Sequence, residues 1–116
     1  MESLDALSTQ EFAEWWRKTG ERELRQVLYW RWDPIGVSRE FPYATDEYDG
    51  YAPQIVSALR ARATQDEIAD ALRSIEKDQM GLATASAEHL GAVAAYVVEW
   101  YENSQKAWRA FGPLRR

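Results

Sequence analysis

Apolar residues recur every three or four positions over the last third of the chain. From about Ser86 to Ala110 this spacing places them on one face of an α-helix, and Gly112-Pro113 is typical of its end. The sequence therefore predicts one long amphipathic helix here. Its stripe consists of Leu90, Val93, Val97, Tyr101, Ser104, Trp108 and Phe111.

A capping signal marks the start of a helix near the beginning of the chain. Ser8 and Glu11 have the S-x-x-E spacing of a capping box, in which two reciprocal hydrogen bonds satisfy amide groups that a helix start leaves unpaired. Phe12, Trp15 and Trp16 then share one face. A basic last turn followed by Gly20 predicts that this helix ends there.

A second helix is predicted from about Glu21 to Trp32. Leu24, Val27 and Leu28 share one face, and acidic residues at positions 21 and 23 suit the positive end of a helix dipole. Pro34 ends the helix, because its ring disfavours the helical conformation at position 33.

The third helix carries the apolar residues Ile55, Val56 and Leu59, but its start is open to two interpretations. Either Asp46 caps it and Pro53 distorts its second turn, which we prefer, or Pro53 occupies the first turn.

A fourth helix follows from a second capping box, formed by Thr64 and Glu67. Ile68, Leu72 and Ile75 lie at helical spacing after it. The sequence Met80-Gly81 predicts its end.

Between the second and third helices, residues 33–50 lack periodicity and contain two prolines and two glycines. Connections of this length are unusual in compact domains. The many aromatic and aliphatic residues of segment 33–50 predict an ordered loop that packs back on the helices. The fold class is thus all-α: a compact bundle of about five helices with one long ordered loop between helices 2 and 3, in a single domain spanning residues 1–116.

Composition narrows the classes of function. The chain has 116 residues, a formal charge of −5, one histidine and no cysteine, which excludes disulfides and thiolate chemistry. Net acidity argues against nucleic acid as a partner and favours a basic protein. The absence of a long apolar run or a signal-like start predicts a cytoplasmic protein that does not bind membranes.

The most distinctive charged cluster lies in the long loop. Asp33, Asp46, Glu47 and Asp49 can serve a Mg²⁺ or Mn²⁺ site, because carboxylates are the ligands that hard cations prefer, or they can attract basic side chains of a partner. The simpler interpretation is that Asp33 and Asp46 hydrogen-bond to backbone amides at turns and helix starts. We favour this structural role for these two residues.

The chain also contains six tryptophans. Neighbours in the pairs Trp15-Trp16 and Trp30-x-Trp32 diverge by about 100° and 200° around a helix, so they cannot all face the core. At least one indole is expected at the surface, where tryptophan is typical of protein-binding hot spots. His89 is expected to be structural or solvent-facing.

Three strings, WDPIGV at residues 32–37, DEYDGY at 46–51 and MGL at 80–82, resemble the pattern of the YugE-like family of small helical bacterial proteins. The similarity covers about residues 24–82. The resemblance implies a small helical cytoplasmic protein without an established catalytic residue, and some similar small acidic proteins lie among bacterial immunity genes. It also implies that the first two strings form one structural unit.

Together these features predict a non-catalytic, acidic protein-binding module, such as an immunity- or antitoxin-like inhibitor, with no catalytic residue, metal or cofactor. A carboxylate-metal enzyme and a homo-oligomeric structural protein stay open as alternatives. The predicted partner-binding residues lie in or beside the long loop: Trp32, Asp33, Tyr43, Asp46, Glu47, Tyr48, Asp49 and Tyr51.

Overall fold

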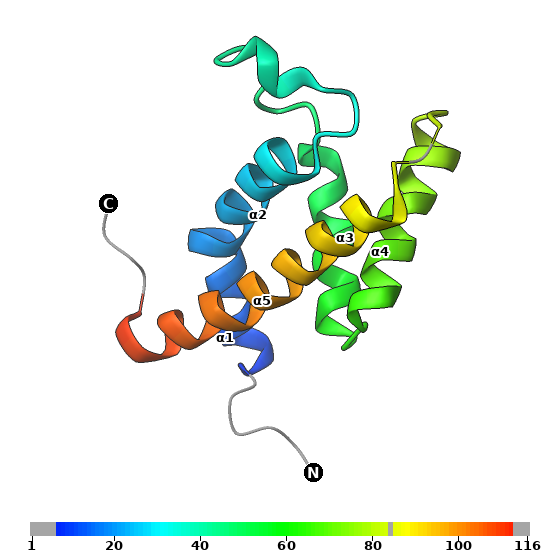
Figure 1. The fold of residues 1–116 in the computed structure, drawn as a ribbon. Coiled ribbons are helices and arrows are strands. Elements are labelled where there is room, and N and C mark those ends of the chain that lie inside the picture. Colours follow the sequence, from blue (N-terminus) through cyan, green and yellow to red (C-terminus); the bar gives the residue numbers. More distant parts are fainter. Residues whose placement is uncertain (1–6, 84, 113–116) are drawn as a thin grey trace.

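Helix α5, Ala87–Phe111, crosses the other helices of the molecule (Figure 1). Of its predicted stripe, Leu90, Val93, Val97 and Trp108 are buried, whereas Phe111 is 79% exposed, so its inclusion in the stripe is wrong. The structure, a computed structural model, describes residues 7–83 and 85–112, and these residues form helices and turns without a strand. The prediction of an all-α bundle is confirmed. Ser86 caps α5 by accepting a hydrogen bond from the His89 amide, and Gly112, with φ of 70°, follows its end; Pro113 lies outside the described residues.

The first two predicted helices are one continuous rod. It comprises α1 (Thr9–Trp15), a π-helical turn (Trp16–Gly20), α2 (Glu21–Val27) and a second π-helical turn (Leu28–Trp32). The capping box of Ser8 and Glu11 is confirmed at its start.

The predicted helix end at Gly20 is wrong. Gly20 has ordinary helical angles, and a Cβ atom placed on it would lie 2.7 Å from Cζ2 of the Trp15 indole. Glycine is therefore present because the ring packs against the backbone. Since no helix begins at position 21, the expected dipole role of Glu21 and Glu23 is wrong as well.

The rod ends where Pro34 predicts. Asp33 adopts a left-handed conformation with φ of 38°, which turns the chain out of the helix axis. The side chain of the preceding Trp32 is buried, and its Nε1 donates a 2.7 Å hydrogen bond to Oε2 of the buried Glu76. The other oxygen of that carboxylate accepts a hydrogen bond from the Ala85 amide. These bonds tie the end of the rod to the segment that leads into α5.

Helix α3 runs over Ala52–Arg60 and has Pro53 in its first turn. The preferred start at Asp46 is therefore wrong. Residues 41–48 form turns, and short 3₁₀ helices occupy Val37–Glu40 and Asp49–Tyr51. Proline fits the first turn of a helix because the amide it lacks would have no partner there.

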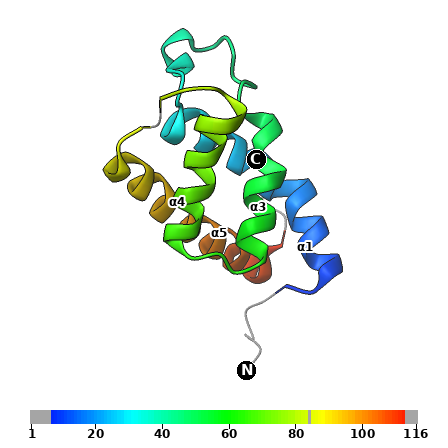
Figure 2. The ribbon, with the colours of Figure 1, turned by 90° about the vertical axis from the view of Figure 1, so that its right-hand side faces the viewer.

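The capping box of Thr64 and Glu67 is confirmed at the start of α4, Gln65–Ser74, which continues as a π-helical turn over Ile75–Gln79. The predicted end at Met80-Gly81 is also confirmed, since Gly81 has φ of 68°. A short connection joins α3 to α4, and these two helices pack side by side (Figure 2). Both helices contribute to one core with α2 and α5. The largest buried side chains of this core are Trp15, Trp32, Tyr48, Leu24, Leu28, Ile55, Ile68, Leu72, Ile75 and Leu90.

No helix within residues 7–83 and 85–112 combines the length and the apolar character that crossing a membrane requires.

The contact between Gly20 and Trp15 makes a testable prediction. Glycine-to-alanine changes inside helices normally stabilise by about 1 kcal/mol, whereas forcing a methyl group into a packed site costs about 1–3 kcal/mol. We expect Gly20→Ala to lower the free energy of unfolding in urea. The matched control is Gly91→Ala in α5, where an added Cβ meets no atom within 4 Å, and this variant should raise stability. Equal stabilisation by both changes would contradict the packing explanation.

Candidate functional site

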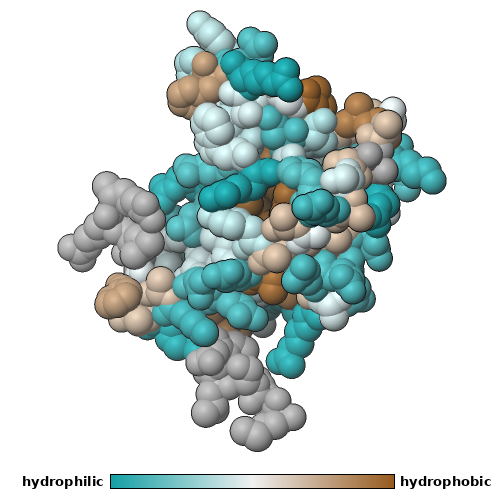
Figure 3. Space-filling view, in the orientation of Figure 1, coloured by the Kyte–Doolittle hydropathy of each residue, from teal (hydrophilic) through white to brown (hydrophobic). Residues whose placement is uncertain are grey.

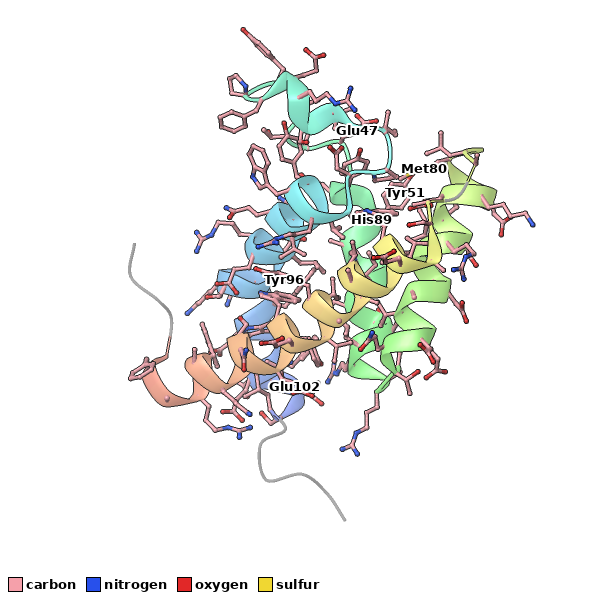
Figure 4. All side chains as sticks on the ribbon, viewed as in Figure 1. Glu47, Tyr51, Met80, His89, Tyr96 and Glu102 are labelled. Atoms are coloured by element: carbon pink, nitrogen blue, oxygen red, sulfur yellow. The ribbon has the colours of Figure 1, made fainter. Side chains whose placement is uncertain are left out.

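The long loop extends beyond the helices at one end of the molecule (Figure 1). It begins at Asp33 and leads into α3 at Ala52. Figure 4 places Glu47 on this loop, while Tyr51 and His89 lie below it, at the starts of α3 and α5. The middle of the loop therefore forms a surface beyond the helices, while its two ends connect to the core.

The Asp33 carboxylate organises the first half of the loop. Its Oδ1 accepts hydrogen bonds of 2.8 Å from the Val37 amide and 2.7 Å from the Tyr48 hydroxyl. Its Oδ2 accepts one of 3.1 Å from the Ser38 amide and another from the Ser38 hydroxyl. The carboxylate thus caps the 3₁₀ helix at Val37–Glu40. The predicted structural role of Asp33 is confirmed.

Tyr48 connects this carboxylate to the core. Its ring is buried and lies 5.5 Å from the Trp32 ring, between centroids. Its hydroxyl donates to Asp33 and accepts a 3.1 Å hydrogen bond from the Ile35 amide. Burial, together with the bond to Asp33, raises the pKa of the Tyr48 phenol well above its usual range. The hydroxyl consequently stays protonated and can keep donating.

The environment of Asp33 stabilises its charged form. Partial burial raises the pKa of this carboxyl, but the hydrogen bonds from Ser38, Tyr48 and Val37 outweigh that effect and hold the pKa below its ordinary value. The hydrogen-bond donors around Asp33 therefore stabilise its ionised carboxylate, and these bonds help to hold the loop in its folded conformation.

A second tyrosine fixes the far part of the loop. The ring of Tyr29, on the first helical rod, is buried, and its hydroxyl donates a 3.1 Å hydrogen bond to the Tyr43 carbonyl. The Val37 carbonyl lies 3.4 Å from the same hydroxyl. The loop backbone is thus held at both Val37 and Tyr43 by side chains of other segments.

Several rings of this region remain at the surface. The relative exposure is 51% for Trp30, 59% for Phe41 and 76% for Tyr43. The Trp30 and Phe41 rings pack together with centroids 5.2 Å apart. We call Trp30, Phe41 and Tyr43 the aromatic surface. Figure 3 shows hydrophobic side chains beside hydrophilic ones over the loop.

The carboxylates of the loop fall into two groups. Glu40, Asp46 and Glu47 are exposed, whereas Asp49 is half-buried and lies 3.6 Å from the Nε atom of Arg25. Burial raises the pKa of Asp49, and the charge of Arg25 opposes this shift. On the exposed part of the loop, these three carboxylates outnumber its one exposed cation, Arg39.

The structural role predicted for Asp46 is wrong. Its carbonyl accepts a hydrogen bond from the Asp49 amide within a turn, but within the described residues its side chain forms no hydrogen bond. Asp46 is instead one of the exposed charges.

The predicted site residues therefore separate by burial. Tyr43, Asp46 and Glu47 are exposed, and Asp49 and Tyr51 are partly exposed. Trp32 and Tyr48 are each only 1% exposed, so these two residues cannot contact a partner and act by positioning the loop.

Sequence reasoning left Trp30 and Phe41 out of the site. Trp30 could have been included, because its spacing from Trp32 required one of the two indoles to face outward, as the structure confirms. Phe41 carries no such signal, since its exposure depends on the path of the loop.

The carboxylates do not assemble into a metal site. Over residues 7–83 and 85–112, no three side chains of the types that bind metals are grouped closely enough to hold an ion. Both oxygens of Asp33 already accept hydrogen bonds from the loop. His89 is exposed, and its Nε2 lies 3.2 Å from the Trp32 carbonyl, to which the protonated nitrogen donates. This bond agrees with the structural role expected for His89.

Comparison of the chain with models of known protein families, with curated proteins and with solved structures finds no match.

The Asp33 network predicts an acid-sensitive contribution to stability. Because the folded-state pKa lies below the unfolded value of about 4, this contribution is complete above that pH and is lost as the pH falls through the folded-state pKa. We expect Asp33→Asn to lower the free energy of unfolding at pH 7 by about 1–3 kcal/mol. The variant should also lose less stability than the wild type between pH 7 and pH 3.

Tyr48→Phe is the matched variant, since it keeps the buried ring and removes only the hydroxyl between Asp33 and Ile35. Urea unfolding at both pH values should show a loss of about 1 kcal/mol and a largely retained acid dependence. An Asp33→Asn protein as stable as the wild type at pH 7 would contradict the role of this carboxylate.

Proposed function

We propose that this chain is a small, acidic, non-catalytic module that binds a basic protein partner through the long loop. The observation that carries the proposal is the aromatic surface, Trp30, Phe41 and Tyr43, exposed on and beside a backbone that hydrogen bonds hold in place. Large exposed rings of this kind are enriched at the energetic centres of protein interfaces.

Fixing the backbone before binding favours affinity. A loop that becomes ordered only on binding loses conformational entropy at that step, whereas one already held by Asp33 and Tyr29 does not. Tryptophan and tyrosine also bury much area while immobilising few rotatable bonds. The rings can therefore serve as anchors without a large ordering cost.

Charge supports a basic partner. Residues 33–51 contain five carboxylates, at positions 33, 40, 46, 47 and 49, against one cation, Arg39. Three of these carboxylates, Glu40, Asp46 and Glu47, are exposed on the same loop as Phe41 and Tyr43. An acidic rim raises the rate of association with a basic surface and selects against acidic competitors.

An immunity- or antitoxin-like inhibitor is the form of binding module that we propose. Support for this narrower role comes from the resemblance to the YugE-like bacterial proteins and from the net charge of −5. Inhibition of a basic toxin needs only a tight, preorganised surface on the inhibitor. A cytoplasmic location belongs to the same proposal.

The proposal is tested by capturing a basic protein from an extract of the source organism and then titrating the purified partner by calorimetry. We expect Phe41→Ala combined with Tyr43→Ala to weaken binding by about tenfold or more, because both rings would lie in the interface. The matched control is Phe111→Ala, whose ring is 79% exposed near the end of α5, outside the loop.

Two results would count against the proposal. Equal weakening by the loop variant and by Phe111→Ala would mean that the loop is not the binding surface. Capture of further copies of this chain alone, with light scattering showing a stable oligomer, would favour the homo-oligomeric alternative instead.

A further inference from the structure

A second surface feature lies away from the loop, between α1, the end of α3 and the second half of α5. It is a pocket of about 590 Å³, within the range of about 300–1,000 Å³ that is usual for small-molecule sites. Apolar side chains, among them Phe12, Leu59 and Val98, form part of its wall. Figure 4 labels Glu102, which also lines the pocket, on α5. The partner-binding loop contributes no residue to it.

The charge of this pocket is opposite to that of the whole chain. Arg60, Arg62 and Lys106 line it together with one carboxylate, Glu102, whereas the chain carries a formal charge of −5. A cationic pocket in an acidic protein concentrates anions locally. The combination of cations with an apolar wall fits a ligand that has both an anionic and an apolar part.

The first of these cations is held in place by its neighbours. The Arg60 guanidinium lies over the Phe12 ring, 4.2 Å from its centroid, and its Nη2 is 3.4 Å from the Thr9 hydroxyl oxygen. Burial raises the pKa of the nearby Tyr101 phenol, and a hydrogen bond with Gln105 and then the charge of Arg60 oppose that shift. The guanidinium therefore contributes a positioned positive charge at the pocket wall.

Arg62 occupies a strained backbone position. It follows the end of α3 with φ of 66°, and its amide donates a 3.0 Å hydrogen bond to the Leu59 carbonyl. The next amide, of Ala63, donates to the Ala58 carbonyl, which completes the turn that usually has glycine at this left-handed position. An arginine here carries a steric cost that glycine would avoid. Strain of this kind is concentrated at functional sites.

We propose that this pocket binds an amphipathic carboxylate of the fatty-acid class. The carboxylate pairs with the cations that line the pocket, Arg60, Arg62 and Lys106, and the hydrocarbon chain lies against Leu59 and Val98. This proposal is independent of partner binding by the loop.

Calorimetric titration with decanoate below its micelle concentration tests the proposal. Decanol and decyltrimethylammonium, which carry the same chain with no charge and with a positive charge, are the ligand controls. We expect decanoate to bind tightest and decyltrimethylammonium weakest, because only the carboxylate complements the cations of the pocket. Backbone amide shifts in NMR spectra should change at Val98 and Tyr101.

The Arg62→Gly variant separates binding from folding. Glycine suits the left-handed backbone, so the variant should fold and unfold at a temperature no lower than the wild type, yet bind decanoate about fivefold or more weakly. Lys106→Gln should weaken binding in the same direction. Lys77→Gln removes an exposed cation that does not line the pocket and is the matched control, with unchanged affinity expected.

The proposal is overturned if decanoate binds no better than decyltrimethylammonium. It is equally overturned if Arg62→Gly and Lys77→Gln bind decanoate alike, or if the shifts fall on residues 33–51 in place of the pocket.

Discussion

The junction between Trp32 and Asp33 is the point on which the arrangement of the helices and the loop depends. These consecutive residues face different parts of the molecule, because the left-handed conformation of Asp33 turns the chain immediately after the helix. The Trp32 indole bonds to the buried Glu76, and the Asp33 carboxylate bonds to the loop. The Trp32 carbonyl also accepts a hydrogen bond from Nε2 of His89, at the start of α5. One dipeptide thus joins the first rod, the turn that continues α4, α5 and the loop.

A partly buried polar network fixes the same rod against α5. The Ser104 hydroxyl accepts a 2.9 Å hydrogen bond from the Trp15 indole and donates one of 2.7 Å to the Glu23 carboxylate. That carboxylate also accepts a 3.0 Å bond from the Trp100 indole. Directional bonds of this type add specificity to aromatic packing, because the rings can satisfy their N–H groups in only one register. The loop therefore rests on helices whose relative placement is well determined.

Local signals in the sequence predicted much of this fold. Both capping boxes, the helix end before Pro34 and the stripe of α5 as far as Trp108 follow from short-range rules, and the structure agrees with each. The predicted helix end at Gly20 was wrong because glycine can either end a helix or allow a close contact with its backbone. Only the position of the Trp15 ring distinguishes these two roles. The start of α3 was ambiguous because Asp46 and Pro53 are both valid start signals.

The candidate sites were harder to predict from the sequence than the helices, because they depend more on tertiary structure. Aspartate before proline predicted the structural role of Asp33, but no local rule tells that the Tyr48 ring is buried while the Tyr43 ring is exposed. The strained position of Arg62 was equally invisible, since its cost arises from the turn that the backbone adopts. Burial and strain are properties of the assembled fold. The sequence could therefore locate the loop, but it could not tell which loop residues are exposed and which are buried and hold the loop in place.

The most direct test of this account is amide hydrogen exchange, measured by NMR on the wild-type protein at neutral pH. The amides of Val37 and Ser38 donate to the Asp33 carboxylate, so they should exchange more slowly than expected for an unstructured chain. Such protection would establish that the loop is ordered in the free protein, as a preorganised binding surface requires. Exchange of both amides at unstructured rates would contradict the central role of the junction.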